Sequence, residues 1–243
     1  MIPSSITLAS QSIPVKVIRE RRTSFRAATG KEGFILRLPK QLPKSEEKRA
    51  WDWFENWAKE LHRSKPSFLD RFTSKQYADG DVLEVGARKY TLGINLSERA
   101  SHAARLLPNR YIQLDLVAAA SEEERNKATT TLLSRLVAQD FLPEFSRRVL
   151  ELNQLHFRKA IKNIRFKNTS SRWGSCSNTG NLNFSTRLLF APQEVIDYVI
   201  IHELAHLVEL NHSDRFWALV EQAMPDYGVQ EKWLKKNGAG LGF

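Results

Sequence analysis

IHELAHLVELNHS occupies residues 201–213 of the 243-residue chain. On an α-helix, residues four positions apart lie on the same face, so His202 and His206 can direct two imidazole nitrogens at one metal ion. Glu203 is adjacent and reaches the same place. In this H-E-x-x-H spacing the two histidines hold zinc, and the glutamate is general base to the zinc-bound water. A third ligand from His212 would leave the fourth zinc position open to water, as in catalytic sites.

Two observations favour a zinc site over a histidine pair that is merely hydrogen-bonded in a core. Residues 191–194 (APQE) are typical of a helix start, and the largely apolar run 195–201 (VIDYVII) predicts that this helix is buried. Imidazoles and a carboxylate on a buried helix need partners that offset their desolvation, and zinc supplies them. Three of the six histidines also fall within residues 202–212.

The assignment of His212 as third ligand can be compared with the metzincins, whose three zinc-binding histidines have the same spacing. In metzincins a glycine lets the chain turn after the second histidine, whereas Glu209 stands at that position here. We therefore expect the turn at Asn211, because asparagine tolerates a left-handed conformation. Met224 falls within an expected helix and is interpreted as helix packing rather than as a Met-turn. The alternative to His212 is ligation by an acid such as Glu209 or Glu221.

Composition indicates a folded protein with a real core, since 42% of the residues are hydrophobic. No apolar run approaches the roughly eighteen residues of a membrane span, and residues 1–5 lack the features of a secretory signal. Cys176 is the only cysteine, which excludes an internal disulfide and a cysteine-rich zinc module. We therefore expect a cytoplasmic protein with no membrane partner.

The charge of the chain is unevenly distributed. The net charge is +10, of which +9 falls in residues 1–110 and +1 in residues 111–243. The stretch 147–187 nevertheless holds nine basic residues against one acid, Glu151. Such a cluster can attract nucleic acid, an acidic polypeptide or a phosphate-bearing surface. The alternative is a solvated face that keeps the protein in solution.

The first part of the chain alternates apolar and polar residues as half-buried strands do. The expected strands are residues 13–19, 34–38, 82–85, 90–94 and 111–116. We expect the first two to form a hairpin through a turn at 30–33, and the next two to form a second hairpin. A helix from Ser45 to Leu61 carries a tryptophan-rich stripe that is interpreted as core packing. No internal repeat is visible. Residues 1–115 are thus predicted to be a β-rich N-terminal part with a Trp-rich helix.

A helix start at Ser121 and the pair Leu142-Pro143 predict two helices separated by a break, the second ending near Phe157. Three short strands follow, within residues 164–185. The middle strand, Arg172-Trp173-Gly174-Ser175-Cys176, is the candidate edge strand that pairs with a substrate backbone. Gly174 fits a close backbone approach, although an ordinary strand glycine is the alternative. We expect residues 237–242 to fray.

Six stretches of the second half carry a resemblance to a known family: residues 172–176, 182–184, 188–192, 198–207, 211–213 and 216–217. Together they resemble the YgjP-like metallopeptidases, bacterial relatives of the SprT-like zinc peptidases. The resemblance covers about residues 150–235. It implies zinc bound by His202, His206 and His212, with Glu203 as general base. Some SprT-like relatives act on proteins bound or cross-linked to DNA, but the resemblance does not imply that substrate here.

These observations predict an α+β fold. Residues 116–243 would form a zincin-like metallopeptidase core, with a small antiparallel or mixed sheet beside the active-site helix. The expected function is zinc-dependent hydrolysis of a polypeptide, with one zinc ion per chain and an oxyanion donor among Arg172, Tyr198 and Tyr227. The alternative function is a nucleic-acid- or protein-binding module whose zinc is structural and which lacks peptidase activity.

Overall fold

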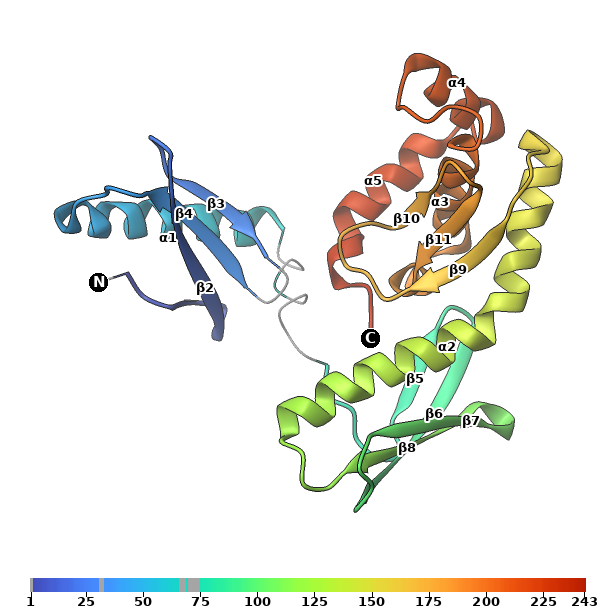
Figure 1. The fold of residues 1–243 in the computed structure, drawn as a ribbon, viewed down its shortest axis with the longest axis horizontal. Helices are drawn as coiled ribbons and strands as arrows, with labels where there is room; N and C mark the ends of the chain where they lie inside the picture. The colour runs from blue at the N-terminus through green and yellow to red at the C-terminus, as the bar shows by residue number, and fades with distance from the viewer. Residues whose placement is uncertain (1, 31–32, 66–68, 70–74) are drawn as a thin grey trace. The chain divides into compact units, whose positions relative to one another are not determined.

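The computed structural model describes residues 2–30, 33–65, 69 and 75–243. The chain divides into two compact units, residues 1–73 and 74–243, and each has its own hydrophobic core. The described residues form a mixed α+β structure with three small mixed sheets and five α-helices (Figure 1). None of the helices within these residues has the length and apolar character that a membrane crossing requires.

The first unit is a four-stranded sheet followed by a helix. Its elements are β1 (Ser5–Leu8), β2 (Gln11–Glu20), β3 (Arg26–Thr29), β4 (Phe34–Pro39), a short 3-10 turn (Lys44–Glu46) and α1 (Glu47–Ser64). The strand order is β1-β2-β4-β3. The predicted strands 13–19 and 34–38 are confirmed, but the hairpin between them is wrong because β2 and β4 pair in parallel. β3 forms the hairpin with β4 instead.

The predicted turn at 30–33 therefore joins β3 to β4. The Gly30 N–H donates to the Gly33 carbonyl at 2.7 Å, and residues 31 and 32 lie outside the described part of the chain. Alternation predicts which side chains face the core, but it does not predict which strands become neighbours.

The Trp-rich helix α1 covers the sheet of the first unit. Ala50, Phe54 and Ala58 follow one another at a spacing of four residues and are fully buried. The rings of Phe54 and Trp57 contact Phe34 of β4 edge-on, with centroids 5.8 and 5.6 Å away. Interpretation of the aromatic stripe as core packing is confirmed.

The second unit begins with a sheet of the same connectivity. Its strands are β5 (Val82–Val85), β6 (Arg88–Ser97), β7 (Ala103–Leu107) and β8 (Tyr111–Val117), with Pro108–Arg110 as a 3-10 turn. In both units two antiparallel hairpins are joined by a parallel pairing of their second strands, and a helix follows. The fold therefore contains a repeat that is not visible in the sequence.

The long helix α2 (Glu122–Leu152) leads from this sheet to the rest of the unit. It begins with a capping box, in which the Ser121 hydroxyl accepts from the Glu124 N–H and the Glu124 carboxylate accepts from the Ser121 N–H. The predicted start is thus confirmed. The predicted break at Leu142-Pro143 is wrong, because Pro143 lies inside the helix.

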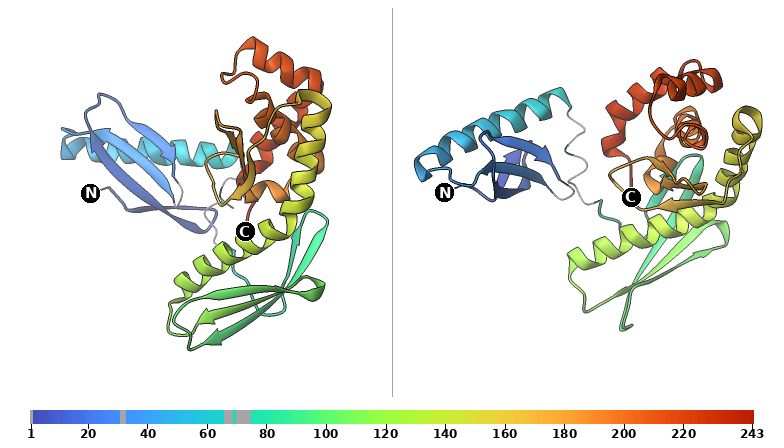
Figure 2. Two further views of the ribbon diagram at one scale, coloured as in Figure 1. Left: turned by 45° about the vertical axis from the view of Figure 1, so that its right-hand side comes forward. Right: turned by 45° about the horizontal axis from the view of Figure 1, so that its top comes forward.

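Local and tertiary features accommodate Pro143. Proline removes the N–H that would bond the Gln139 carbonyl, and Gln139 lies on the exposed side of the helix. The neighbouring Asp140 carbonyl accepts from Arg88 Nη1 at 2.7 Å. Residues on both sides of Pro143 belong to one core, so packing holds the two halves together while the helix changes direction (Figures 1 and 2).

The remaining elements surround one buried helix, α3. They are a π-helical turn (Asn153–Phe157), β9 (Asn163–Lys167), β10 (Gly174–Cys176), β11 (Asn181–Ser185), a 3-10 segment (Thr186–Phe190), α3 (Gln193–Ala205), α4 (Asp214–Ala223), α5 (Tyr227–Asn237) and a last 3-10 turn (Gly238–Gly240). β11 pairs with β10 antiparallel and with β9 in parallel. β10 is an edge strand of this small sheet, as predicted.

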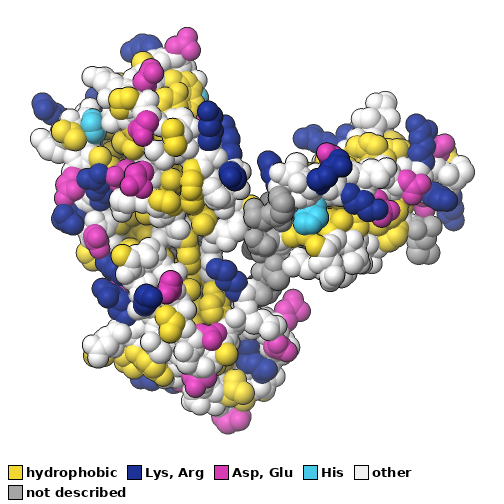
Figure 3. Space-filling view, turned by 180° about the vertical axis from the view of Figure 1, so that it is seen from behind, with side chains coloured by type: hydrophobic (Ala, Val, Ile, Leu, Met, Phe, Trp, Pro, Cys, Tyr) yellow, Lys and Arg dark blue, Asp and Glu magenta, His cyan; other side chains and the backbone are white. Residues whose placement is uncertain are grey.

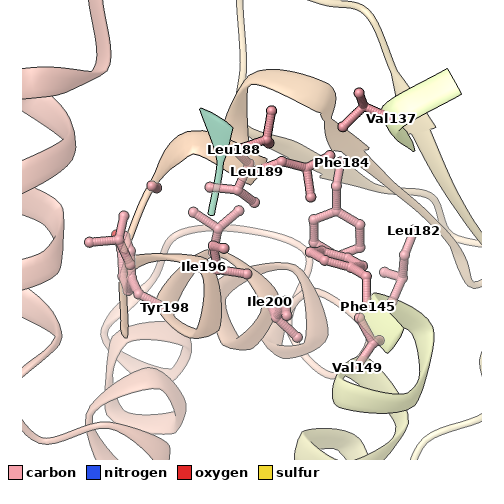
Figure 4. Close-up of a cluster of buried hydrophobic side chains, with 14 of the residues drawn as sticks. Val137, Phe145, Val149, Leu182, Phe184, Leu188, Leu189, Ile196, Tyr198 and Ile200 are labelled. Atoms are coloured by element: carbon pink, nitrogen blue, oxygen red, sulfur yellow. The ribbon is translucent and has the colours of Figure 1, made fainter. Parts of the chain in front are cut away.

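Aromatic packing fixes the small sheet on α2. The centroid of the Phe145 ring lies 4.9 Å from that of Phe184 (Figure 4). It lies 4.6 Å from the centroid of the Phe166 ring. Arg148 of α2 donates two hydrogen bonds to the buried Asp197 of α3, at 3.0 and 2.6 Å. α3 is therefore held from several sides, which agrees with the burial predicted from its apolar sequence.

The C-terminal segment is held by Arg187, so the predicted fraying of residues 237–242 is wrong. Arg187 donates to the Leu241 carbonyl at 2.7 Å and to the Gly238 carbonyl. Its guanidinium carbon also lies 4.7 Å from the centre of the Trp173 ring. The expectation of fraying rests on glycine content alone, and the partner that prevents it lies about fifty residues earlier in the chain.

The predicted domain boundary between residues 115 and 116 falls inside the second unit. It cuts the chain inside β8, six residues before α2 begins at Glu122. The division of the chain by contacts lies at 73/74. Assignment of a separate metallopeptidase domain to residues 116–243 stays a prediction.

Candidate metal centre

Three histidines converge at the C-terminal end of α3. His202 lies in the last turn of the helix, and His206 is its C-cap residue with helical backbone angles. Each histidine offers one ring nitrogen, and these three atoms all lie within 4.8 Å of one another. The Nε2 atoms of His202 and His212 are 3.1 Å apart. This cluster is the candidate metal centre, and three imidazole nitrogens are a donor set suited to zinc.

A hydrogen bond orients His206, and burial favours the neutral form of His202 and His206. His206 Nδ1 lies 3.1 Å from the Glu209 carbonyl oxygen, which fixes the N–H on Nδ1 and leaves the Nε2 lone pair for a metal. Burial lowers the pKa of His202 to about 4, with further lowering from the neighbouring histidines. Burial likewise lowers the pKa of His206. Both rings therefore carry a lone pair at neutral pH.

The turn after α3 is made without a left-handed residue. The Leu207 and Glu209 N–H groups donate to the Leu204 and Ala205 carbonyls, at 3.0 and 2.9 Å. None of the described residues from 206 to 213 has a positive φ, so the turn expected at a left-handed Asn211 is wrong. Successive hydrogen-bonded turns reverse the chain instead.

Helix α4 supports the cluster from its first turn. Ser213 is the N-cap, and its hydroxyl accepts from the Phe216 N–H. The fully buried Phe216 ring lies beneath all three imidazoles, with centroid distances of 4.9, 4.5 and 4.7 Å to His202, His206 and His212. Trp217 stacks on His212 at 5.8 Å and 27°. These rings restrict the orientation of the three imidazoles.

The acidic alternatives to His212 lie outside this cluster. Among the described residues, the group of nitrogen, sulfur and oxygen donors that could hold a metal contains the three histidines and neither Glu209 nor Glu221. The Glu209 carboxylate lies 3.7 Å from Arg215. The geometry therefore favours His212, and its assignment as third ligand is a proposal.

Glu203 is buried against β10, with 5% of its surface exposed. A Cβ at Gly174 would lie 2.5 Å from Glu203 Oε1, so the close approach expected at Gly174 is made by this carboxylate. Burial raises the pKa of Glu203 to about 8, while the charge of Arg172 and a hydrogen bond from the Cys176 backbone act to lower it. A cation held by the histidines would lower it further and favour the ionised base.

One edge of β10 is open beside Glu203. The Ser177 N–H donates to the Asn181 carbonyl at 3.0 Å, so Ser177 and every second residue before it direct their backbone groups toward β11. Gly174 and Cys176 direct theirs to the opposite edge, where the Cys176 N–H meets the Glu203 carboxylate. A peptide extended along this edge would pass directly over the carboxylate.

The other residues of the predicted substrate strand have different surroundings. Arg172 is exposed, whereas Gly174 and Ser175 are half-buried, and all three line one small cavity. Trp173 packs instead against the C-terminal segment, where a Cβ at Gly238 would lie 2.4 Å from its ring. Trp173 therefore has a supporting position rather than one that faces a ligand.

Both tyrosines proposed as oxyanion donors lie near the cluster. Tyr198 precedes His202 by one helical turn, with ring centroids 6.0 Å apart. Tyr227 begins α5 and stacks on Tyr198 at 6.3 Å and 15°. Burial raises the pKa of Tyr198 to about 12, so its hydroxyl keeps its proton at neutral pH. The choice between Tyr198, Tyr227 and Arg172 stays a prediction.

Sequence reasoning missed three contacts of this centre. They are the hydrogen bond between the Glu209 carbonyl and His206, the hydrogen bond from the Cys176 N–H to Glu203, and the packing of the Phe216 ring against the three imidazoles. The two backbone contacts leave no signal in residue types. Phe216 has a signal, because it follows His212 at the start of an expected helix, but its apolar neighbours favour an interpretation as packing alone.

The basic residues of 147–187 do not form one uniform surface. Arg147 and Arg148 pair with Glu151 at 2.8 and 3.4 Å, and Arg187 is committed to the C-terminal segment. On the face in Figure 3, Lys and Arg are interspersed with Asp and Glu. Six exposed cations of the stretch form no ion pair among the described residues: Arg158, Lys159, Lys162, Arg165, Lys167 and Arg172.

Comparison with known protein families agrees with the geometry. Residues 8–237 match the YgjP-like family, described as YgjP-like, metallopeptidase domain. None of the curated proteins compared with the sequence matches it. The metallopeptidase zymogen of Pyrococcus abyssi abylysin is a similar solved structure, with 21% identity, a TM-score of 0.36 and coverage of 39% of this chain and 95% of that chain. The metallopeptidase zymogen of Methanocaldococcus jannaschii jannalysin is another, with 25% identity, a TM-score of 0.33 and coverage of 37% of this chain and 91% of that chain.

Proposed function

The chain belongs to the YgjP-like metallopeptidase family, and from that premise we propose that it hydrolyses peptide bonds with one zinc ion and Glu203 as general base. His202, His206 and His212 hold the zinc in this proposal. The catalytic part is the zincin-like region 116–243, and residues 1–115 are an additional β-rich part. The substrate is a polypeptide, and a cytoplasmic location stays a prediction.

One observation carries the proposal, namely the convergence of three imidazoles beside one buried carboxylate and an open strand edge. The ring nitrogens lie within 4.8 Å of one another, and Glu203 is buried against that edge. Three protein ligands leave a coordination position open, which is the arrangement of catalytic rather than structural zinc sites.

The chain supplies the proton transfers and the positioning. Zinc at this site would act as a Lewis acid that polarises the scissile carbonyl and acidifies the attacking water. Glu203 takes one proton from that water on a carboxylate oxygen and gives it to the leaving amine nitrogen, so no covalent intermediate with the protein forms. The open edge of β10 aligns the substrate backbone, and a tyrosine hydroxyl or Arg172 donates to the developing oxyanion.

The alternative, a binding module with a structural zinc, has less support. Structural zinc sites are usually closed by four protein ligands, and only three candidates meet here among the described residues. The nucleic-acid partner proposed for the basic stretch is also weakened, because several of its arginines make internal contacts.

Removal of the metal tests the proposed function directly. The purified protein is expected to contain about one zinc per chain and to cleave an unfolded protein substrate. Chelation should abolish cleavage and stoichiometric zinc should restore it, because the Lewis acid is lost and regained. Metal analysis and electrophoresis of the substrate provide the measurement. Cleavage that persists in the metal-free protein would exclude the proposed mechanism.

The third ligand is tested by a matched pair of variants. His212→Ala should lower zinc affinity by more than the roughly 10- to 100-fold that loss of an outer-sphere partner costs. Glu209→Gln should retain zinc, because Glu209 contributes only its backbone carbonyl. Competition with a chromophoric chelator measures both affinities. Unchanged affinity in His212→Ala would remove that ligand, and loss of zinc in Glu209→Gln would assign the acid in its place.

A further inference from the structure

A polar cavity of about 190 Å³ lies along β10, β11 and the end of β9. It adjoins Gly174, whose other side contacts Glu203. Apart from Arg172, which is one candidate donor to the oxyanion, the zinc chemistry proposed above assigns no role to the residues of this cavity. Six polar side chains line it: Lys167, Thr169, Arg172, Ser175, Asn183 and Ser185.

The cavity has a fixed polar floor. On β11, Asn183 and Ser185 alternate with Phe184, which faces the core. The Asn183 amide donates to the Ser175 hydroxyl at 3.3 Å. The fully buried Ser185 hydroxyl donates to the Thr169 carbonyl at 2.8 Å, which ties the loop before β10 to the floor.

The charged groups of the cavity are all positive. Lys167 and Arg172 line it together with no carboxylate, and neither forms an ion pair among the described residues. Glu203 lies on the other face of β10, where the Arg172 charge acts on it from a distance. Hydroxyl and amide donors beside two cations are suited to bind a carboxylate.

The position of the cavity relates it to a bound peptide. Ser175 pairs with Asn183 across β10 and β11, so their side chains share the face that carries the cavity. A peptide residue that lies opposite Ser175 on the open edge would direct its side chain to this same face. That side chain would therefore lie toward the cavity that Arg172 and Lys167 line.

We propose that this cavity is a specificity subsite that selects an acidic side chain, Asp or Glu, at one position of the polypeptide substrate. The inference rests on the proposed peptidase function, because it assigns the cavity to a peptide bound along β10. It predicts that cleavage sites in a mixed peptide library are enriched in Asp and Glu at a single position relative to the scissile bond.

The test compares two peptides that differ only by Glu or Gln at that position, using the full-length zinc-loaded protein. The value of kcat/KM should be about tenfold higher for the Glu peptide, the effect of one charge-assisted hydrogen bond. Lys167→Gln should lower this ratio, and Lys167→Glu should reverse it in favour of a Lys peptide. Lys162→Gln is the matched control, because Lys162 is exposed in the same basic stretch but does not line the cavity, and it should keep the wild-type ratio.

Failure of the subsite and failure of the peptidase proposal give different results. Equal kcat/KM for the two peptides, or equal ratios in Lys167→Gln and Lys162→Gln, would overturn the subsite while leaving the peptidase intact. If no peptide is cleaved, the peptidase proposal fails. Fluorescence anisotropy of the same labelled peptides then decides the subsite alone, since tighter binding of the Glu peptide that depends on Lys167 supports it and equal binding overturns it.

Discussion

Replacement of Glu203 by Gln is expected to lower peptide hydrolysis by about 10²- to 10⁴-fold, the usual contribution of a general base, while zinc stays bound. The amide has nearly the same size as the carboxylate but cannot accept the proton of the attacking water. The three histidines are unchanged, so the metal centre should persist. Initial rates on an unfolded protein substrate, together with metal analysis of the same sample, provide the measurement.

The variant also separates chemistry from stability. Burial raises the pKa of Glu203 to about 8, so the metal-free protein holds a carboxyl group whose charge is costly to bury. The amide of the Glu203→Gln variant carries no charge and should leave the metal-free protein equally or more resistant to unfolding. Wild-type activity in this variant would exclude Glu203 as the base. With zinc retained and hydrolysis lost, the variant can trap substrates for identification by mass spectrometry.

Replacement of Gly174 by Ala should reduce hydrolysis by roughly 100-fold, the scale of a misplacement near 1 Å in an active site. The new Cβ would lie 2.5 Å from both Cγ and Oε1 of Glu203, so the carboxylate must move away from the strand edge. Zinc binding should be retained, because the three histidines themselves are unchanged. Thermal unfolding should show that overpacking lowers the free energy of unfolding by about 1–3 kcal/mol.

Gly228→Ala is the matched control for this substitution. Gly228 lies in α5, and a Cβ built there meets nothing within 4 Å. Alanine is favoured over glycine in a helix by about 0.5–1 kcal/mol, so this variant should unfold at an equal or higher temperature and keep full activity. If Gly174→Ala behaves in the same way, the close packing of Glu203 on β10 has no catalytic role.

Sequence patterns predict which side chains meet at the candidate centre better than they predict the path of the chain. His202, Glu203 and His206 are related by local helical geometry, which depends only on spacing. His212 reaches the cluster only through a turn that backbone hydrogen bonds make, and these leave no pattern in the residue types. Its position near the other two histidines is therefore predictable from the spacing, whereas the left-handed conformation predicted at Asn211 is wrong. The contact between Gly174 and Glu203 joins residues 29 positions apart, and only the fold brings them together.

The errors in the fold have the same physical origin. The alternation in 13–19 and 34–38 predicts two strands, but their parallel pairing depends on β3, which has a weak pattern. Pro143 predicts a break from local geometry, whereas packing of both helix halves in one core overrides it. Local rules thus fail where a distant partner determines the outcome.

The anchoring of the C-terminal segment has a consequence for biosynthesis. Arg187 joins the carbonyls of Gly238 and Leu241 to the Trp173 ring, immediately before the strand that borders Glu203. Residues 238–241 leave the ribosome after the three histidines and the strand have already been made. Chains fold progressively as they are synthesised, so the edge of β10 gains its final support only after residues 238–241 have emerged. A partly made chain therefore contains all three histidines before the strand edge that would bind a substrate is held in place.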